Sequence, residues 1–176
     1  LTNYKAIDNS QLISFSVRDI LINNDNAHIK DIIYIAPDAG ASHKIYKSLE
    51  AANIEDQDII ICSKERDAQG NLTQTKVPLR AEAHKYKDFI IIDDICDGGR
   101  TFINIAKELK EYLKRPTIKE FSGKIYLIIT HGIFSAGFKE LSQYFDGIYC
   151  TNSYSNIGDY AGNDMEKTNV KQLNVF

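Results

Sequence analysis

Short apolar runs that alternate with longer amphipathic stretches are the feature that most constrains the fold of this chain. The apolar runs, rich in isoleucine, predict strands at 31–36, 58–63, 89–94, 124–130 and 147–150. Stretches with a helical period predict helices at 10–22, 41–53, 101–114 and 135–145. Continuous apolar strands, without two-residue alternation, are typical of a parallel sheet that is covered on both faces. We therefore predict an α/β fold with a mainly parallel central sheet flanked by helices.

The crossover between the second and third predicted strands departs from this pattern. Residues 64–88 are polar, carry Gly70 and Pro78, and show no convincing helical period. We predict a long loop here. Long loops inside compact domains are functional or disordered more often than idle.

Length and charge narrow the class of protein. A chain of 176 residues, 43% of them hydrophobic, fits one compact domain over 1–176. The net charge of −3 arises from 21 basic and 24 acidic residues that are mixed along the chain. No basic stripe indicates nucleic acid or an anionic membrane as a partner. Any anionic ligand must therefore be held by local groups.

The cysteines and the lengths of the apolar runs indicate in which cell compartment the protein is expected. Cys62, Cys96 and Cys150 are odd in number and form no Cys-x-x-Cys pair, which argues against a disulfide framework or a zinc site. No apolar run approaches the roughly 20 residues of a membrane span, and the first residues lack the regions of a signal peptide. We expect a cytoplasmic protein. The chain begins with Leu1 instead of methionine, and we expect it to be part of a longer product.

Ligands of an open parallel sheet bind at the carboxyl ends of its strands, which singles out the segment after the third predicted strand. That segment reads Asp-Asp-Ile-Cys-Asp-Gly-Gly-Arg-Thr over 93–101. The two glycines allow backbone amides to approach a ligand, and a helix beginning near Thr101 presents unpaired amides, so together they predict a phosphate cradle. Asp93 and Asp94 suit sugar hydroxyls or Mg²⁺ one step away. The block predicts a pentose 5-phosphate site; an acidic strand end followed by an ordinary Gly-Gly turn is the structural alternative.

The same block carries a resemblance to a known family. An apolar strand followed by Asp-Asp-x-x-Asp-Gly-Gly-x-Thr resembles the signature of type I phosphoribosyltransferase folds, which bind ribose 5-phosphate or its pyrophosphorylated form, PRPP. The further blocks APDAGASHK, CSKERD and THGIFS stand in the order and approximate spacing of the ribose-phosphate pyrophosphokinase (PRPP synthetase) family, specifically its C-terminal domain. The resemblance covers residues 31 to about 154.

This resemblance implies three groups of site residues. Ribose 5-phosphate is expected at Asp93, Asp94, Asp97, Gly98, Gly99, Arg100 and Thr101, with the acidic pair near the ribose hydroxyls. The pyrophosphoryl part is expected at Asp38, Ala39, Gly40 and Ala41, where Ala41 replaces a glycine that is common in the family. The cofactor Mg²⁺ is expected at Asp38, Asp93 and Asp94.

The resemblance also implies catalytic residues in the polar crossover. Lys64 and Arg66 match the basic pair on the mobile catalytic loop of the family. Cationic groups on such a loop act as clamps for the negative charge that spreads over oxygens during phosphoryl transfer. Glu65, between them, departs from the more basic version of this loop. The alternative is that these residues form a solvated charge run on a surface loop.

The implied activity is transfer of a diphosphoryl group from ATP to ribose 5-phosphate, giving PRPP and AMP. The implied partners are these two substrates and further copies of the enzyme in a homo-oligomer. Family members have a preceding domain of similar size that contributes much of the ATP site, and nothing in residues 1–30 resembles it. We therefore expect this chain to be the C-terminal half of a two-domain enzyme, with low activity by itself.

Other functions remain open at this stage. One is a phosphoribosyltransferase of nucleobase salvage, whose base-binding hood would have to lie within 151–176. Another is a non-catalytic regulatory homologue, although Lys64, Arg66 and the acidic pair are all present. A receiver domain is disfavoured because receivers carry their acidic pair after the first strand, whereas here it follows the third.

Two residues inside these blocks are left out of the predicted catalytic set. His131 follows a predicted strand, where a packed or hydrogen-bonded histidine is at least as expected as a nucleotide or metal ligand. Cys96 lies within the phosphate block, but no histidine is near it in sequence, so an apolar filler is favoured over a nucleophile.

Overall fold

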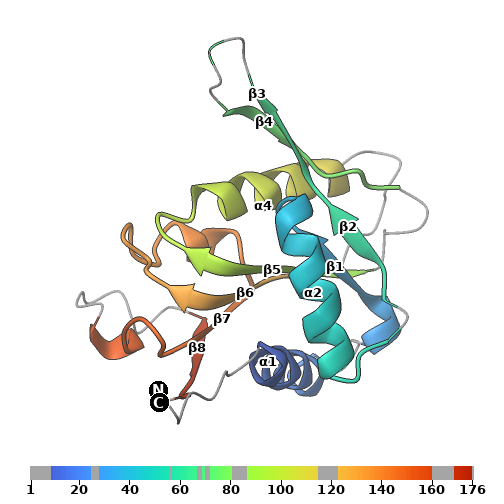
Figure 1. Ribbon diagram of the computed structural model, residues 1–176. Coiled ribbons are helices and arrows are strands. Elements are labelled where there is room, and N and C mark those ends of the chain that lie inside the picture. Colours follow the sequence, from blue (N-terminus) through green and yellow to red (C-terminus); the bar gives the residue numbers. More distant parts are fainter. Residues whose placement is uncertain are drawn as a thin grey trace, which may run out of the picture.

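The computed structural model describes residues 9–24, 28–55, 57–66, 69, 72–80, 87–114, 123–159 and 169–175. Six strands form one sheet in the order β2-β1-β5-β6-β7-β8, and every neighbouring pair is parallel (Figure 1). Their bounds are β1 Ile32–Ala36, β2 Ile59–Ile61, β5 Asp88–Cys96, β6 Ile125–Gly132, β7 Gly147–Thr151 and β8 Val170–Leu173. The predicted α/β class with a mainly parallel sheet is confirmed.

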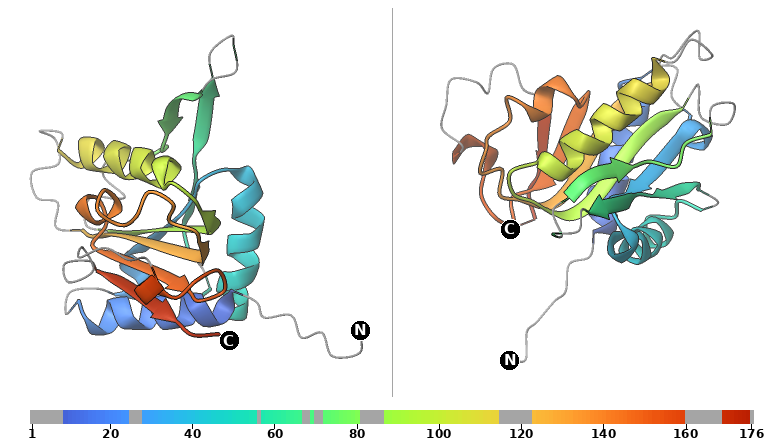
Figure 2. Two further views of the ribbon diagram at one scale, coloured as in Figure 1. Left: turned by 90° about the vertical axis from the view of Figure 1, so that its left-hand side faces the viewer. Right: turned by 90° about the horizontal axis from the view of Figure 1, so that it is seen from above.

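Helices cover both faces of this sheet. They are α1 Ser10–Ile22, α2 Ala39–Ala51 and α4 Arg100–Leu113. In the side view α4 lies on one face and α1 on the opposite face, together with α2 (Figure 2). Among the described residues, no helix is long and apolar enough to cross a membrane.

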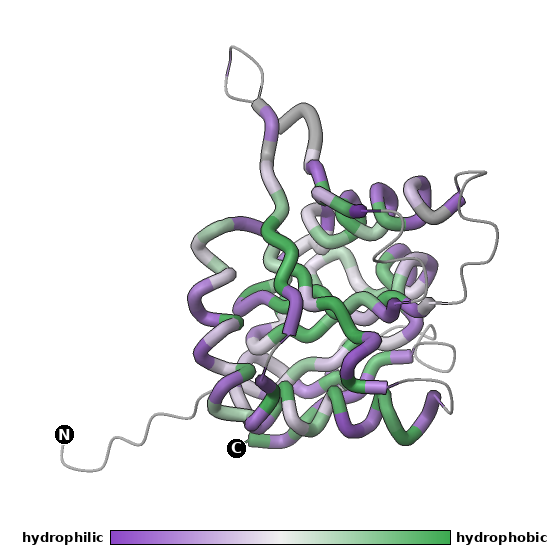
Figure 3. Tube along the Cα trace, turned by 90° about the vertical axis from the view of Figure 1, so that its right-hand side faces the viewer, coloured by the Kyte–Doolittle hydropathy of each residue, from purple (hydrophilic) through white to green (hydrophobic). Residues whose placement is uncertain are grey.

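The alternation of side chains along the strands explains the two layers. In β1, whose residues are all buried, Ile33 and Ile35 join the core under α4, while Tyr34 and Ala36 join the core under α1 and α2. A strand that is covered on both faces must be apolar at every position, which is why the strand sequences show no two-residue alternation. The hydropathy tube shows the same arrangement, with hydrophobic residues along the central strands and hydrophilic ones on the outer turns of the helices (Figure 3).

The polar crossover contains an antiparallel hairpin where the sequence predicted a loop. Its strands are β3 Ser63–Arg66 and β4 Leu72–Lys76. β3 follows β2 almost directly, so the hairpin projects beyond the carboxyl edge of the sheet (Figure 1). The predicted long loop over 64–88 is therefore wrong where these two strands lie, and its residues 67, 68, 70, 71 and 81–86 are outside the described part of the chain. The strand sequences SKER and LTQTK are mostly polar, so they have no apolar pattern by which to recognise them.

The predicted helix at 135–145 is also wrong. This stretch consists of turns and one short 3₁₀ segment, Leu141–Gln143. Gly137, within this stretch, has φ of 70°, and Phe134, just before it, has φ of 45°; no α-helix accommodates either value. Phe138, Leu141 and Phe145 are still buried in the core, so their helix-like spacing reflects docking and not helix formation.

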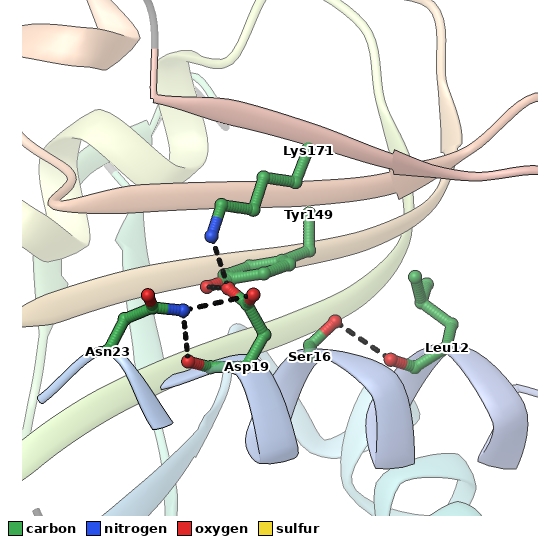
Figure 4. Close-up of polar contacts among 6 residues, drawn as sticks. All are labelled: Leu12, Ser16, Asp19, Asn23, Tyr149 and Lys171. Atoms are coloured by element: carbon green, nitrogen blue, oxygen red, sulfur yellow. Dashed lines mark hydrogen bonds and ion pairs between the residues drawn. The ribbon is translucent and has the colours of Figure 1, made fainter. Parts of the chain in front are cut away.

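A polar cluster fixes α1 against the far end of the sheet (Figure 4). Asp19 Oδ2 accepts hydrogen bonds from the Tyr149 hydroxyl at 2.8 Å and from Lys171 Nζ at 2.5 Å. Burial by itself would raise the pKa of Asp19, but the hydrogen bonds from Lys171 and Tyr149 outweigh burial and lower it. The cluster joins α1 to β7 and to the edge strand β8, which had no counterpart among the predicted strands.

Candidate functional site

The sheet has its topological switch point between β1 and β5. These strands are neighbours, yet the chain leaves β1 toward β2 and leaves β5 toward β6, in opposite directions across the sheet. The connections after them run on opposite faces, through α2 and α4, so the loops at their carboxyl ends diverge. Such a switch point is where open parallel sheets bind ligands. The predicted pyrophosphate loop follows β1, and the predicted phosphate loop follows β5.

A pocket of about 800 Å³ opens at the end of β5, on the side of α4. Its lining brings together six of the seven residues predicted for ribose 5-phosphate, namely Asp93, Asp97, Gly98, Gly99, Arg100 and Thr101. The remaining wall comes from Ile95 of β5, from residues of the first two turns of α4, and from Ala136 and Glu140 of the loop after β6. A strand-end carboxylate and a helix N-terminus therefore share one pocket.

Gly99 is required by the backbone at the start of α4. It precedes the first helical residue with φ of +76°, a conformation that only glycine adopts readily. A Cβ at this position would lie 2.9 Å from Leu141 Cδ2, closer than side-chain atoms pack. Because Gly99 has no side chain to cap the helix, the amides of the first turn of α4 receive no side-chain acceptor from the cap position, and Gly99, Arg100 and Thr101 line the pocket. This arrangement suits an anion.

The block Thr-His-Gly-Ile-Phe-Ser, residues 130–135, braces the phosphate loop. The amides of Ile133 and Phe134 donate to the carbonyl of Cys96 at 2.8 and 3.1 Å, and the amide of Ser135 donates to the carbonyl of Asp97 at 3.2 Å. The sequence identified this block but not its contacts with the phosphate loop. The glycine at position 132 is the sequence feature that marks the turn, because a Cβ there would lie 2.0 Å from Phe134 Cε2 and only glycine fits.

The acidic pair is divided between two environments. Asp93 lines the large pocket with the phosphate loop. Asp94 instead lines a small pocket beside α2, to which Asp93 and Ala41 also contribute. There the Asp94 carboxylate forms an ion pair with Lys44 and accepts a hydrogen bond from Asn9 Nδ2 at 3.4 Å. Asp94 is thus the one residue of the predicted ribose 5-phosphate set that is outside the large pocket.

The predicted pyrophosphate loop forms the N-terminus of α2. Asp38 is its cap residue, and Asp38 Oδ1 accepts a hydrogen bond from the amide of Ala41 at 3.1 Å. Ala39 and Gly40 are exposed, whereas Ala41 is buried in the core under α2. The methyl group of Ala41 therefore packs inward and does not fill the exposed side of the loop.

Lys44 was not singled out in the sequence, yet it forms an ion pair with Asp94, one of the predicted metal ligands. The hydrogen bond to Asp94 raises the pKa of Lys44, and the charges of Asp93 and Asp38 act in the same direction. One ammonium group therefore lies in the field of all three carboxylates. The only signal for Lys44 in the sequence is its position in the second turn of the helix that follows the Asp38 cap.

The predicted catalytic residues lie in β3. The backbone of Lys64 pairs with Thr75, and that of Arg66 pairs with Leu72 after a register shift. Glu65, which departs from the family pattern, forms an ion pair with Lys76 across the hairpin at 2.5 Å. Its charge is thus partly compensated within the hairpin.

Cys96 is a packed residue, as predicted, whereas His131 is exposed and hydrogen-bonded. Cys96 is fully buried in the core, where burial first, and then the charges of Asp97 and Asp93, raises the pKa of its thiol to about 12. A thiol with such a pKa is protonated near neutral pH and is a poor nucleophile. His131 is exposed, and its Nδ1 lies 2.6 Å from Ser153 Oγ, so it is a hydrogen-bonded histidine at the end of β6.

Curated proteins of similar sequence are ribose-phosphate pyrophosphokinases. The chain is 28% identical over 130 residues to the one from Rhizobium meliloti (strain 1021), an alignment that covers 74% of this chain and 36% of that protein. It is 29% identical over 131 residues to the one from Granulibacter bethesdensis, covering 74% of this chain and 37% of that protein. The chain thus spans little more than a third of the curated relatives it matches. No family profile matches the chain.

Among solved structures, the fold is similar to the crystal structure of phosphoribosylpyrophosphate synthetase from Mycobacterium smegmatis. The TM-score is 0.65 at 16% sequence identity, and the match covers 95% of this chain and 46% of that one. At this identity the likeness concerns the fold alone. Together the comparisons confirm the resemblance to ribose-phosphate pyrophosphokinases and the type I phosphoribosyltransferase-like fold.

Proposed function

We propose that this chain is the ribose 5-phosphate half of a ribose-phosphate pyrophosphokinase, which transfers the diphosphoryl group of ATP to ribose 5-phosphate and releases AMP. The observation that carries the proposal is the pocket that joins Asp93 to the loop Asp97–Thr101 at the start of α4. Backbone amides at a helix N-terminus suit a 5-phosphate, and a carboxylate accepts hydrogen bonds from ribose hydroxyls. The curated relatives, which align with 74% of the chain, support the reaction class.

In the proposed reaction, the anomeric hydroxyl oxygen of ribose 5-phosphate attacks the β-phosphorus of ATP. The bond between that phosphorus and the oxygen bridging it to the α-phosphorus breaks, AMP leaves, and the hydroxyl proton passes to solvent. Gly98, Gly99 and the first turn of α4 anchor the 5-phosphate, and Asp93 orients the ribose. Holding the sugar at both ends fixes the position of the attacking oxygen and lowers the entropic part of the barrier.

The diphosphoryl group is assigned to groups near the switch point between β1 and β5. The loop Asp38–Ala41 lies across the switch point from the phosphate loop and is proposed to receive the pyrophosphoryl part. Lys64 and Arg66 of the hairpin are proposed as the cationic clamps. Transition states of phosphoryl transfer spread negative charge over oxygens, so positioned cations supply most of the stabilisation.

Mg²⁺ fits the donor set of this site. Protein-bound Mg²⁺ commonly has one or two carboxylate ligands and completes its shell with water and substrate phosphates. Within the described part of the chain, no three His, Cys, Asp or Glu side chains cluster as a full metal site. Asp38, Asp93 and Asp94 are near enough to act on one ammonium group, which gives the partial oxygen set that such a site needs. Bound there, Mg²⁺ would neutralise charge on the transferred phosphates.

The test is release of AMP from ATP and Mg²⁺ that depends on ribose 5-phosphate, measured on the protein that contains this chain. The proposal predicts AMP and PRPP in equal amounts, and no AMP when ribose replaces ribose 5-phosphate. Tight binding of ribose 5-phosphate without AMP release would contradict the synthetase. Nucleobase-dependent consumption of PRPP would instead identify a phosphoribosyltransferase.

A further inference from the structure

The pocket at the start of α4 continues past the phosphate loop. Its volume of about 800 Å³ lies in the range that encloses a drug-sized molecule, and ribose 5-phosphate is smaller than such a molecule. The lining runs from Arg100 along α4 through Asn104 to Lys107, and it includes Ala136 and Glu140 of the loop after β6. Ribose 5-phosphate on the phosphate loop would therefore leave part of this pocket unfilled.

Arg100, Asn104 and Lys107 lie on one face of α4. Residues three and four positions apart are neighbours on a helix surface, and helical side chains lean toward the N-terminus. Arg100 and Lys107 are exposed. Within the part of the chain that the structure describes, neither of them forms an ion pair with a carboxylate. The pocket thus carries two cations whose charge is not compensated, and both lean toward the phosphate loop.

Lys107 is supported from the loop after β6. Its Nζ lies 5.2 Å from the centroid of the Tyr144 ring, a cation–π contact, and Tyr144 packs against the core under α4. Lys110 Nζ lies 5.3 Å from the same ring and donates to the carbonyl of Gln143 at 3.0 Å, but Lys110 does not line the pocket. The two lysines therefore share the contact with Tyr144 and differ in their access to the pocket.

We propose that the part of the pocket beside Lys107 is a subsite for a second phosphate, joined to the 5-phosphate of the bound sugar, and that Lys107 is its specificity-determining residue. The inference rests on the proposed function, because it takes the first phosphate to lie on the loop 97–101. The ligand class is a ribose that is linked through a 5-diphosphate to a further sugar or nucleoside, as in ADP-ribose.

The charges around the subsite decide what lies beyond the second phosphate. A diphosphate carries one more negative charge than a phosphate ester in its linked form requires from the loop alone, and Arg100 and Lys107 supply cations for it. Glu140 lines the same pocket and would repel a further free phosphate. A carboxylate accepts hydrogen bonds from hydroxyl groups, so a sugar suits this position better. The other carboxylates of the lining, Asp93 and Asp97, belong to the end that is proposed to hold the ribose and its 5-phosphate.

Calorimetry with ADP-ribose, ribose 5-phosphate and ADP tests the subsite on the protein that contains this chain. The variants are Lys107→Met, Lys107→Arg and Lys110→Met. Lys107→Met should bind ADP-ribose about tenfold more weakly, the range of one charge-assisted hydrogen bond, and ribose 5-phosphate within about twofold of wild type. Lys107→Arg keeps the charge and should restore ADP-ribose binding toward wild type. Lys110→Met also removes a cation from the Tyr144 ring, and it should match wild type with all three ligands.

Competition tests whether the two ligands share the phosphate loop. The terminal ribose of ADP-ribose has the same free anomeric hydroxyl as ribose 5-phosphate, so both can occupy the same position. Saturating ribose 5-phosphate should therefore abolish binding of ADP-ribose. Unchanged binding of ADP-ribose under these conditions would place it at another site and overturn the inference.

Three further results would contradict the subsite. Unchanged ADP-ribose affinity in Lys107→Met is one. Equal losses of ADP-ribose and ribose 5-phosphate would indicate only a general attraction of anions, and equal losses of ADP-ribose and ADP would place the effect at a nucleotide site. If the wild-type protein binds no ribose 5-phosphate, the proposed function fails. The inference is then still decided, because ADP-ribose binding that depends on Lys107 and not on Lys110 supports it, and its absence refutes it.

Discussion

Asp93 and Asp94 are consecutive residues of β5, yet Asp93 lines the pocket at the start of α4 while Asp94 is paired with Lys44 of α2. Adjacent side chains in a strand point to opposite faces, so one acidic pair serves two loops that diverge from the switch point. The sequence suggests two equivalent carboxylates. In the structure their environments differ, so substitutions at Asp93 and at Asp94 are expected to have different effects.

Asp93→Asn is expected to weaken binding of ribose 5-phosphate about tenfold. A hydrogen bond to a charged acceptor is worth roughly 1 to 1.5 kcal/mol more than one to a neutral acceptor. Binding of inorganic phosphate should be equal or tighter, because the variant removes a negative charge near the phosphate loop. Calorimetry with both ligands checks this. Asp58→Asn, at the opposite edge of the sheet, is the control, and parallel losses for both ligands would argue against a sugar contact.

Gly99→Ala is expected to destabilise the protein by about 2 kcal/mol or more and to weaken phosphate binding. An alanine with positive φ costs roughly 1 kcal/mol, and its Cβ would lie 2.9 Å from Leu141 Cδ2. Gly137→Ala separates the two effects, because Gly137 has φ of +70° but nothing within 4 Å of its Cβ. Urea unfolding should show the larger loss at Gly99. Equal losses at the two positions would mean that the contact with Leu141 contributes nothing.

Lys64→Ala or Arg66→Ala is expected to lower kcat about a hundredfold or more, with the fold intact. Groups that act mainly on transition-state charge affect turnover more than substrate affinity. Lys76→Ala, on the facing strand of the hairpin, removes the ion pair with Glu65 and should change kcat little. Steady-state kinetics on the complete enzyme distinguishes these variants. Unchanged turnover in Lys64→Ala and Arg66→Ala would mean that both residues are only part of a solvated run of charges on the surface.

Asp19→Asn is expected to destabilise the protein by about 1 to 2 kcal/mol near neutral pH, because it breaks the link from α1 to Tyr149 and Lys171. The folded-state pKa of Asp19 lies below its ordinary value of 3.8. Its contribution is therefore present above that value and is lost as pH falls through the lower, folded-state pKa. Urea unfolding from about pH 6 to about pH 3 should show the two proteins converging in acid. A constant difference across this range would contradict the assignment.

Much of the fold could be predicted because buried parallel strands and amphipathic helices leave strong patterns. Residues 10–22 form a helix with the predicted bounds, and the five predicted strands are all present with shifted ends. The hairpin β3–β4 could not be predicted, because its strands, SKER and LTQTK, are mostly polar and carry no apolar period. The helix predicted at 135–145 was wrong because Phe138, Leu141 and Phe145 repeat with helical spacing, while the positive φ of Gly137 prevents a helix.

Some features of the candidate site could likewise be predicted from the sequence, and others could not. The phosphate loop could be predicted because Gly99 meets a backbone requirement that is local in sequence. The ion pair of Lys44 and Asp94 joins residues 50 positions apart, so only the packing of α2 on the sheet reveals it. The bracing of the loop by residues 133–135 depends likewise on the pairing of β5 with β6.

The central claim, that this chain binds ribose 5-phosphate at the start of α4, is tested most directly by following its backbone amides by NMR during titration with the sugar phosphate. The account predicts saturable shifts at Gly98, Gly99, Arg100 and Thr101, with smaller shifts for inorganic phosphate and none at Asp58 on the opposite edge of the sheet. Absence of shifts in the 97–101 loop at millimolar ribose 5-phosphate, or shifts confined to another surface, would contradict it.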